Sequence, residues 1–189
     1  MSFFDTPTLA LARRHFLGRS GLVLSGPAVA LLAGNGALAA AAGAADPKDV
    51  QILNTALGAE LEAIAAYQVG AQSNLLQKPA LDLALTFQGH HKEHADLLAK
   101  TIEKLGGKPA AAKAAYDFPV ATLKSQADVL RFAAKLEQGA VSAYLGAVPL
   151  FANRDLSKAA ASILGDEAMH WAVLRQALGD VPVPVAFVA

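Results

Sequence analysis

One apolar stripe, in residues 156–178, constrains this chain more than any other feature. Its apolar residues recur with the 3.6-residue period of an α-helix, but Glu167 and His170 occupy two of the positions that should be buried. Burying a polar group without a partner costs about 2–7 kcal/mol, and a charge costs more. Because Glu and His three residues apart project side by side, the stripe predicts a helix packed against other helices that supply partners for both side chains.

Three further segments carry interrupted stripes of the same kind. Asp46 followed by Pro47 predicts the start of one helix, Gly106 the end of a second, and Ser125, in a Ser-x-x-Asp capping box, the start of a third. Asn153 or Asp155 can cap the fourth. The polar residues that stand at core positions of these four helices are Glu60, His91, His94, Glu137, Glu167 and His170.

The connections between the helices predict the topology. Short links join the first helix to the second and the third to the fourth, so each pair should form an antiparallel hairpin. The middle link, residues 106–124, can extend to roughly 60 Å, more than the roughly 40 Å length of a helix of about 27 residues. The sequence therefore predicts an all-α four-helix bundle with one long crossover between its second and third helices.

The two predicted hairpins also resemble each other in sequence. Residues 60–67 align with residues 137–144, and each stretch begins with Glu and ends with Tyr, while His94 aligns with His170 at nearly the same offset. Such a repeat indicates two copies of one helical hairpin, each bringing half of a site.

A metal site is one of two interpretations of the buried polar residues. Taken singly, each histidine could bond to a backbone carbonyl and each glutamate could reach the surface, which is the commoner situation. All six, interrupting four stripes of a repeated hairpin, favour a shared metal site. The chain has no cysteine, so its ligands must be nitrogen and oxygen, which suit Fe, Mn, Zn or Cu.

Composition excludes several other functions. The formal net charge is zero and no Lys/Arg cluster with aromatic residues occurs, so no nucleic acid partner is expected. The absence of cysteine excludes disulfides, thiolate sites and cysteine nucleophiles. No Ser/His/Asp arrangement or glycine-rich phosphate loop indicates a hydrolase.

Residues 1–45 have the features of an export signal rather than of a folded domain. They contain Arg13 and Arg14 in tandem, no charged residue from Ser20 to Ala45, and small residues of the A-x-A type for cleavage. The segment resembles a twin-arginine signal, which implies a periplasmic mature protein without a stable membrane anchor. A retained anchor is the alternative, because an uncharged run of this length could span about 30 Å of hydrocarbon.

The predicted organisation has three parts. Residues 1–45 form the signal peptide, residues 46–180 the helical bundle, and residues 181–189 a tail broken by prolines. The tail is apolar, and we expect it to be extended and packed on the bundle or on a neighbouring subunit of a homo-oligomer.

The interrupted stripes resemble those of the ferritin-like superfamily, which includes rubrerythrins, bacterioferritins and manganese catalases, and most closely its exported bacterial members. The resemblance covers about residues 48–178. In that family the first and third helices each give a glutamate, often with a tyrosine seven residues later, and the second and fourth each give Glu-x-x-His. Three predicted helices of this chain carry the residues of that family pattern, but His91 stands where the second helix should carry its bridging glutamate. The ligands that the resemblance implies are Glu60, His91, His94, Glu137, Glu167 and His170.

The departure at His91 leaves two hypotheses for the function. With three carboxylates, two divalent ions would leave an excess of about one positive charge, so a dinuclear centre with His91 as a terminal ligand and a mononuclear site are both open. The resemblance implies a periplasmic Fe- or Mn-dependent oxidoreductase acting on dioxygen or peroxide. The alternative is a non-catalytic binding or stress-protection protein with a structural, mononuclear or absent metal. Trp171 and the tyrosines could line the site, and His90 lies beside it or on the surface.

Overall fold

The computed structural model describes residues 46–188, and this part of the chain is all-helical, without a strand. The predicted all-α four-helix fold is confirmed. The predicted signal, residues 1–45, lies outside the described residues. The helices are α3 (Pro47–Gln72), α4 (Lys78–Lys104), α5 (Gln126–Ala147) and α6 (Arg154–Ala177), with short 3-10 turns η1 (Val120–Thr122) and η2 (Val148–Leu150).

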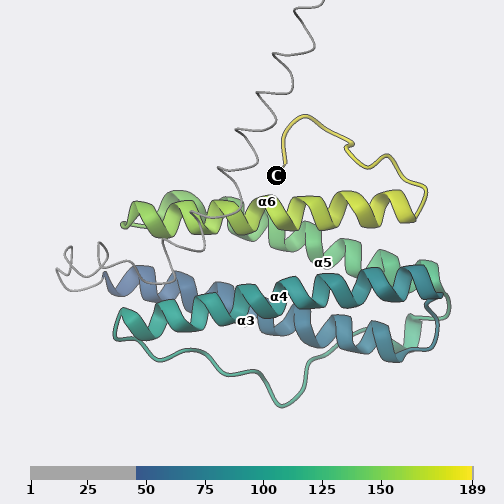
Figure 1. Ribbon diagram of the computed structural model, residues 1–189, viewed down its shortest axis with the longest axis horizontal. Coiled ribbons are helices and arrows are strands. Elements are labelled where there is room, and N and C mark those ends of the chain that lie inside the picture. The colour runs from purple at the N-terminus through teal and green to yellow at the C-terminus, as the bar shows by residue number, and fades with distance from the viewer. Residues whose placement is uncertain (1–45, 189) are drawn as a thin grey trace, which may run out of the picture. The chain divides into compact units, whose positions relative to one another are not determined.

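The helices pack as two antiparallel hairpins, α3 with α4 and α5 with α6 (Figure 1). The long connection between α4 and α5 runs past the α3–α4 hairpin from one end of the bundle to the other. As a result, α3 and α6 run in one direction and α4 and α5 in the other. This is the crossover that the lengths of the links predicted.

The helix starts follow the predicted capping residues. The Asp46 side chain accepts a hydrogen bond from the backbone N–H of Lys48, and the Ser125 hydroxyl accepts one from that of Asp128. Of the two candidates for the fourth helix, Asn153 is the cap, because its side chain accepts from the N–H of Asp155. These bonds satisfy N–H groups that have no partner within the helix.

The third helix and the tail end differently. α5 ends at Ala147 and passes into η2, where Pro149 has no N–H to continue the helical ladder. In the tail, Val183 and Phe187 are exposed and so do not pack on the bundle, while packing on a neighbouring subunit, the other expected arrangement, stays a prediction. Within residues 46–188, no helix is both long enough and apolar enough to span a bilayer.

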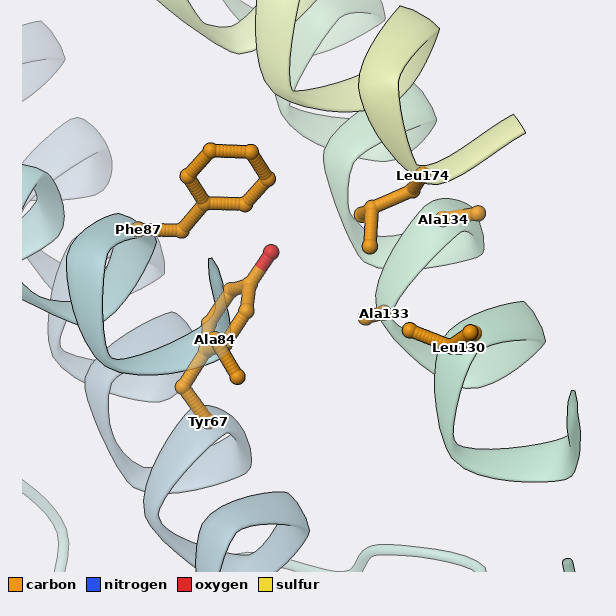
Figure 2. Close-up of a cluster of buried hydrophobic side chains, with 7 residues drawn as sticks. All are labelled: Tyr67, Ala84, Phe87, Leu130, Ala133, Ala134 and Leu174. Carbon is orange, nitrogen blue, oxygen red and sulfur yellow. The ribbon is translucent and has the colours of Figure 1, made fainter. Parts of the chain in front are cut away.

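A cluster of apolar side chains from all four helices fills the bundle beside the polar residues. Figure 2 shows Tyr67 of α3 and Phe87 of α4 projecting toward Leu174 of α6 and the alanines of α5. The small side chains allow the helices to approach closely, and the two rings fill the space between the hairpins. The buried members are Tyr67, Ala84, Phe87, Leu130, Ala133, Ala134 and Leu174.

Asp49 joins the two hairpins at the opposite end of α3. Its carboxylate is buried and accepts hydrogen bonds from the backbone N–H groups of Ala152, at 2.8 Å, and Asn153, at 3.0 Å. Asp49 also lies in the first turn of α3, where an acidic side chain is favourable. In the fold it fixes the turn that leads into α6, and so the direction in which Glu167 and His170 enter the bundle.

We predict that Asp49→Ala lowers the free energy of unfolding by about 1–3 kcal/mol, because two partly buried N–H groups lose a charged acceptor. Urea denaturation followed by circular dichroism measures this. Asp82→Ala is the control, since it removes only an exposed carboxylate that pairs with Lys78, and it should change stability by less than about 1 kcal/mol. Equal effects of the two substitutions would contradict the role given to Asp49.

Candidate metal centre

The six predicted ligands converge between the two hairpins. Each helix contributes at least one of them, and all are buried except His94, whose side chain is 14% exposed. The structure thus brings together every residue that the sequence singled out as a ligand. They are Glu60 of α3, His91 and His94 of α4, Glu137 of α5, and Glu167 and His170 of α6.

The ligand atoms fall into two overlapping groups, each close enough to hold one ion. The first group combines Glu60, His91, His94 and Glu167, and the second combines His91, Glu137, Glu167 and His170. Two residues, Glu167 and His91, belong to both groups. These residues could therefore bind one metal ion or a pair.

Glu167 has the placement of a carboxylate that bridges two ions. Its Oε1 lies 3.1 Å from His94 Nδ1, and its Oε2 lies 3.3 Å from His170 Nδ1. The two oxygens of one carboxylate thus face the two ligand groups separately. A change at Glu167 should affect both groups together.

His91 occupies the place opposite Glu167, between the glutamates of the two hairpins. Its Nδ1 lies 2.8 Å from Glu60 Oε2, and its Nε2 lies 3.3 Å from Glu137 Oε1. A neutral imidazole has one N–H donor and one nitrogen acceptor. His91 can therefore ligate an ion on one side only while its other nitrogen donates to a glutamate.

The two tyrosines tie the hairpins together crosswise. Tyr67 of α3 donates a hydrogen bond to Glu137 Oε1 of α5, and Tyr144 of α5 donates to Glu60 Oε1 of α3 at 2.5 Å. Each tyrosine thus bonds to the glutamate of the other hairpin, although it follows its own glutamate by seven residues. Burial, and then the neighbouring carboxylate, raises the pKa of both phenols, so they remain proton donors that orient the glutamates.

The histidines carry protons in the metal-free centre. Burial lowers the pKa of His91, but hydrogen bonds to Glu137 and Glu60 outweigh it and raise the pKa to about 10. For His94, close contacts with Glu167 and Glu60 outweigh burial and raise the pKa to about 9. For His170, Asp166 and the glutamates outweigh burial and raise the pKa to about 11.

The pKa values of two of the carboxylates shift in the opposite direction, downward. Burial raises the pKa of Glu60, but contacts with His91 and His94 more than reverse this and leave it below the usual value. In Glu137, contacts with His170 and His91 likewise overcome burial and hold the pKa well below its usual range. The metal-free centre is therefore a network of carboxylates neutralised by imidazolium groups.

Three buried atoms in this centre lack hydrogen-bond partners, which tests whether the residues fit a metal. They are His94 Nδ1, Glu137 Oε2 and Glu167 Oε1. The first and third lie 3.1 Å apart, but without the angles of a hydrogen bond. Buried polar atoms left without partners cost free energy that ligation would recover. Nitrogen and carboxylate donors of this kind fit Fe, Mn, Zn or Cu.

Sequence reasoning missed Asp166 as part of the site. Its Oδ2 lies 3.2 Å from His170 Nε2 and 3.4 Å from His94 Nε2, on the side of these rings that faces away from the glutamates. Contact with His170 lowers the pKa of Asp166, so the group stays ionised. The available signal was its position, directly before Glu167 and four residues before His170 on one helix.

Aromatic neighbours orient the second ligand group. The ring of Phe87 stacks on His170, with centroids 4.0 Å apart and planes inclined by 25°. Trp171, which the sequence suggested as a lining residue, instead packs against the apolar cluster, with the Arg175 guanidinium over its ring. The surroundings of His170 are thus set by Phe87 and Asp166.

The sequence model of the ferritin-like domain matches residues 48–180. The chain belongs to this ferritin-like family. The solved structures that match include a conserved hypothetical protein from Mycobacterium tuberculosis, which is 23% identical with a TM-score of 0.64. That similarity covers 70% of this chain and 98% of the other, and it supports the fold. No curated protein matches the chain significantly.

Family membership confirms the ferritin-like topology predicted from the crossover, and the buried ligand groups are consistent with the metal binding expected of such a bundle. His91 stands where the resemblance led us to expect a bridging glutamate. Its imidazole hydrogen-bonds to Glu60 and contacts Glu137.

These pKa shifts predict how the stability of the metal-free protein depends on pH. The histidines, whose pKa values are raised in the fold, stabilise it fully below their ordinary pKa of 6.5. This contribution is lost as pH rises through about 9 to 11. Glu60 and Glu137, whose pKa values are lowered in the fold, stabilise it above their ordinary pKa of 4.5. This contribution is lost as pH falls below that value. The free energy of unfolding should be greatest between about pH 4.5 and 6.5.

Urea denaturation of chelator-treated protein from pH 4 to 10 tests this prediction. His91→Gln is the informative variant, because it removes one imidazolium and should make the alkaline decline shallower. A metal-free wild-type protein that gained stability between pH 6.5 and 9 would contradict the assigned charges.

Proposed function

We propose that this ferritin-like protein binds up to two Fe or Mn ions between its hairpins and uses them in redox reactions with dioxygen or peroxide. The observation that carries the proposal is the pair of ligand groups that share Glu167 and His91. One group is completed by Glu60 and His94, and the other by Glu137 and His170.

The protein residues have distinct parts in this proposal. Glu167 would hold both ions through its separate oxygens, while His91 would ligate from one ring nitrogen and donate from the other. Tyr67 and Tyr144 hold the remaining glutamates in position through their hydroxyls. The bundle excludes bulk water from these groups, since five of the six are buried.

Redox chemistry is supported by the donor set and by an adjoining pocket. Nitrogen and carboxylate ligands suit Fe and Mn, which when bound exchange electrons with dioxygen or peroxide. An apolar pocket lies beside Tyr67, the donor to Glu137. Its walls suit a small apolar molecule such as dioxygen, and they include Ala66, Tyr67, Gly70, Ala84, Leu130, Ala133 and Leu174.

The proposal includes a location. The tandem arginines and uncharged stretch in residues 1–45 support export by the twin-arginine route, so the mature protein would act in the periplasm. A homo-oligomer is compatible with this arrangement, since each chain contains a complete set of ligand groups.

We predict close to two metal ions per chain after loading with Fe²⁺ or Mn²⁺, and the loss of both in Glu167→Gln. Glu60→Gln and Glu137→Gln should each lose one ion, because each removes a ligand from one group only. Plasma mass spectrometry of desalted protein gives the stoichiometry. Glu62→Gln, a neighbouring substitution outside both groups, is the control, and full metal content in Glu167→Gln would refute the shared ligand.

The redox step is tested with anaerobically loaded Fe²⁺ protein mixed with hydrogen peroxide or dioxygen. We expect the absorbance of Fe³⁺ to appear more than about 10-fold faster with wild-type protein than with the same Fe²⁺ mixed with Glu167→Gln, which should leave the iron free in solution. Protein that holds two ions but leaves them reduced would support metal binding without catalysis.

One observation favours that second candidate, a non-catalytic binding or stress-protection protein. Without a metal, His91 already hydrogen-bonds to Glu60 and contacts Glu137, and both tyrosines have carboxylate partners. Much of the centre is therefore satisfied by side chains alone, so the fold does not require an ion at every position. An unchanged unfolding midpoint on removal of metal would fit a binding role in which the ion is not structural.

A further inference from the structure

A second cluster of metal-ligating atoms lies at the rim of the centre. His90 Nδ1 is 2.8 Å from His170 Nε2 and 3.3 Å from Asp166 Oδ2, and His170 Nε2 is 3.2 Å from the same Asp166 oxygen. Ligands bound about 2.0–2.2 Å from one ion stand roughly 2.8–3.6 Å from one another. These three atoms, the outer triad, are therefore spaced as neighbouring ligands of a single ion, and together they form one of the groups suited to hold a metal.

The outer triad is accessible from solvent, unlike the buried groups. The side chain of His90 is 41% exposed and that of Asp166 is 24% exposed, whereas His170 is 2% exposed. An ion held by two imidazoles and one carboxylate on one side would keep its other positions open to water. It could therefore exchange with the surroundings more easily than an ion held by the six buried residues.

The internal repeat explains why this cluster is asymmetric. The offset that relates His94 to His170 also relates His90 to Asp166, so the two rim positions correspond. One hairpin supplies an imidazole there and the other a carboxylate. The difference produces a mixed nitrogen and oxygen donor set, which suits a divalent transition metal better than two carboxylates alone would.

His170 connects the outer triad to the buried centre. Its Nε2 faces His90 and Asp166, while its Nδ1 faces Glu167 at 3.3 Å and Glu137 at 3.5 Å. A neutral imidazole offers a lone pair on one nitrogen at a time. An ion at the rim would leave the proton on Nδ1, and an ion in the centre would leave it on Nε2, where Asp166 accepts it.

Asp166 extends the connection to the other ligand group. The oxygen that faces His170 also lies 3.4 Å from His94 Nε2. His94 is the most exposed of the six ligands of the buried centre, at 14%. A cation near Asp166 is therefore next to a ligand of each buried group.

We propose that His90, Asp166 and His170 form a solvent-accessible binding site for a divalent transition metal, from which ions pass to the buried centre. The binding step stands on the outer triad alone. The delivery step rests on the proposed function of the buried centre. Because neutral His170 serves one side at a time, the rim ion is in transit rather than a permanent third ion.

Stopped-flow absorption after mixing metal-free protein with one equivalent of Co²⁺ tests the proposal. Wild-type protein should show a fast phase whose rate depends on Co²⁺ concentration, from the outer triad, followed by a slower phase independent of concentration. His90→Ala should lose the fast phase and load the centre about 10-fold more slowly or worse. His90 belongs to neither buried group, so the final stoichiometry of this variant should be unchanged.

Two further variants separate the steps. Glu93→Gln, an exposed change on the same helix, should behave as wild type. The double variant Glu60→Gln/Glu137→Gln should keep the fast phase and lose the slow one, since it weakens each buried group and leaves the outer triad intact. Circular dichroism verifies the fold of each variant.

The outcomes that overturn the proposal are distinct from those that overturn the proposed function. A fast phase that persists in His90→Ala would refute the outer triad as a site. A fast phase lost in His90→Ala with unchanged loading of the centre would refute delivery while leaving the rim site. Loss of the slow phase in wild-type protein, with the fast phase present, would instead contradict metal binding by the buried groups.

Discussion

The charge balance among buried carboxylates and imidazoles determines most of what this bundle can do. Three glutamates lie between the hairpins, each almost fully removed from water, and a buried carboxylate without compensation would be too costly to retain. In the metal-free protein the compensation comes from protons on His91, His94 and His170. With metal bound it would come from the ions, and the histidines would have to release those protons. Protonation of the histidines and metal binding are therefore two ways of compensating the same buried negative charge.

His91, at the position where the resemblance implied a glutamate, changes how that negative charge is compensated. Two divalent ions with three buried glutamates would leave about one excess positive charge. Asp166 provides a fourth carboxylate, held 3.2 Å from His170 and 3.4 Å from His94, on the outer side of these ligands. A carboxylate that accepts from a ligating imidazole raises the basicity of that ligand. The negative charge missing from the bridging place is thus present at the rim, where it can also attract cations.

The sequence was sufficient to predict the fold and the position of all six candidate ligands, because both follow from local rules. Helical periodicity places Glu60 and Glu167 on buried faces, and the lengths of the links decide which helices pair. The crosswise bonds of Tyr67 and Tyr144 could not be predicted, since a seven-residue spacing only places each tyrosine on the same helix face as its own glutamate, roughly 10 Å away along the axis, and does not say which residue of another helix it meets. The rim contacts of Asp166 were missed for a related reason. The contacts of Asp166 with His90 and His94 depend on the rotation of α4 against α6, which no single helix encodes. Only its contact with His170 lies within α6 and had a signal in the sequence.

The crosswise tyrosines explain how a bundle can keep its ligands in position before any metal arrives. Tyr144 on α5 holds Glu60 on α3, and Tyr67 on α3 holds Glu137 on α5. Neither hairpin can therefore shift along the other without breaking a buried hydrogen bond. Asp49 adds a third such link near the start of α6. Tyr67 takes only Oε1 of Glu137, and none of these links involves Glu167. Glu137 Oε2 and Glu167 Oε1 therefore remain without partners. The fold thus holds the centre rigid through some polar atoms and keeps others available for an ion.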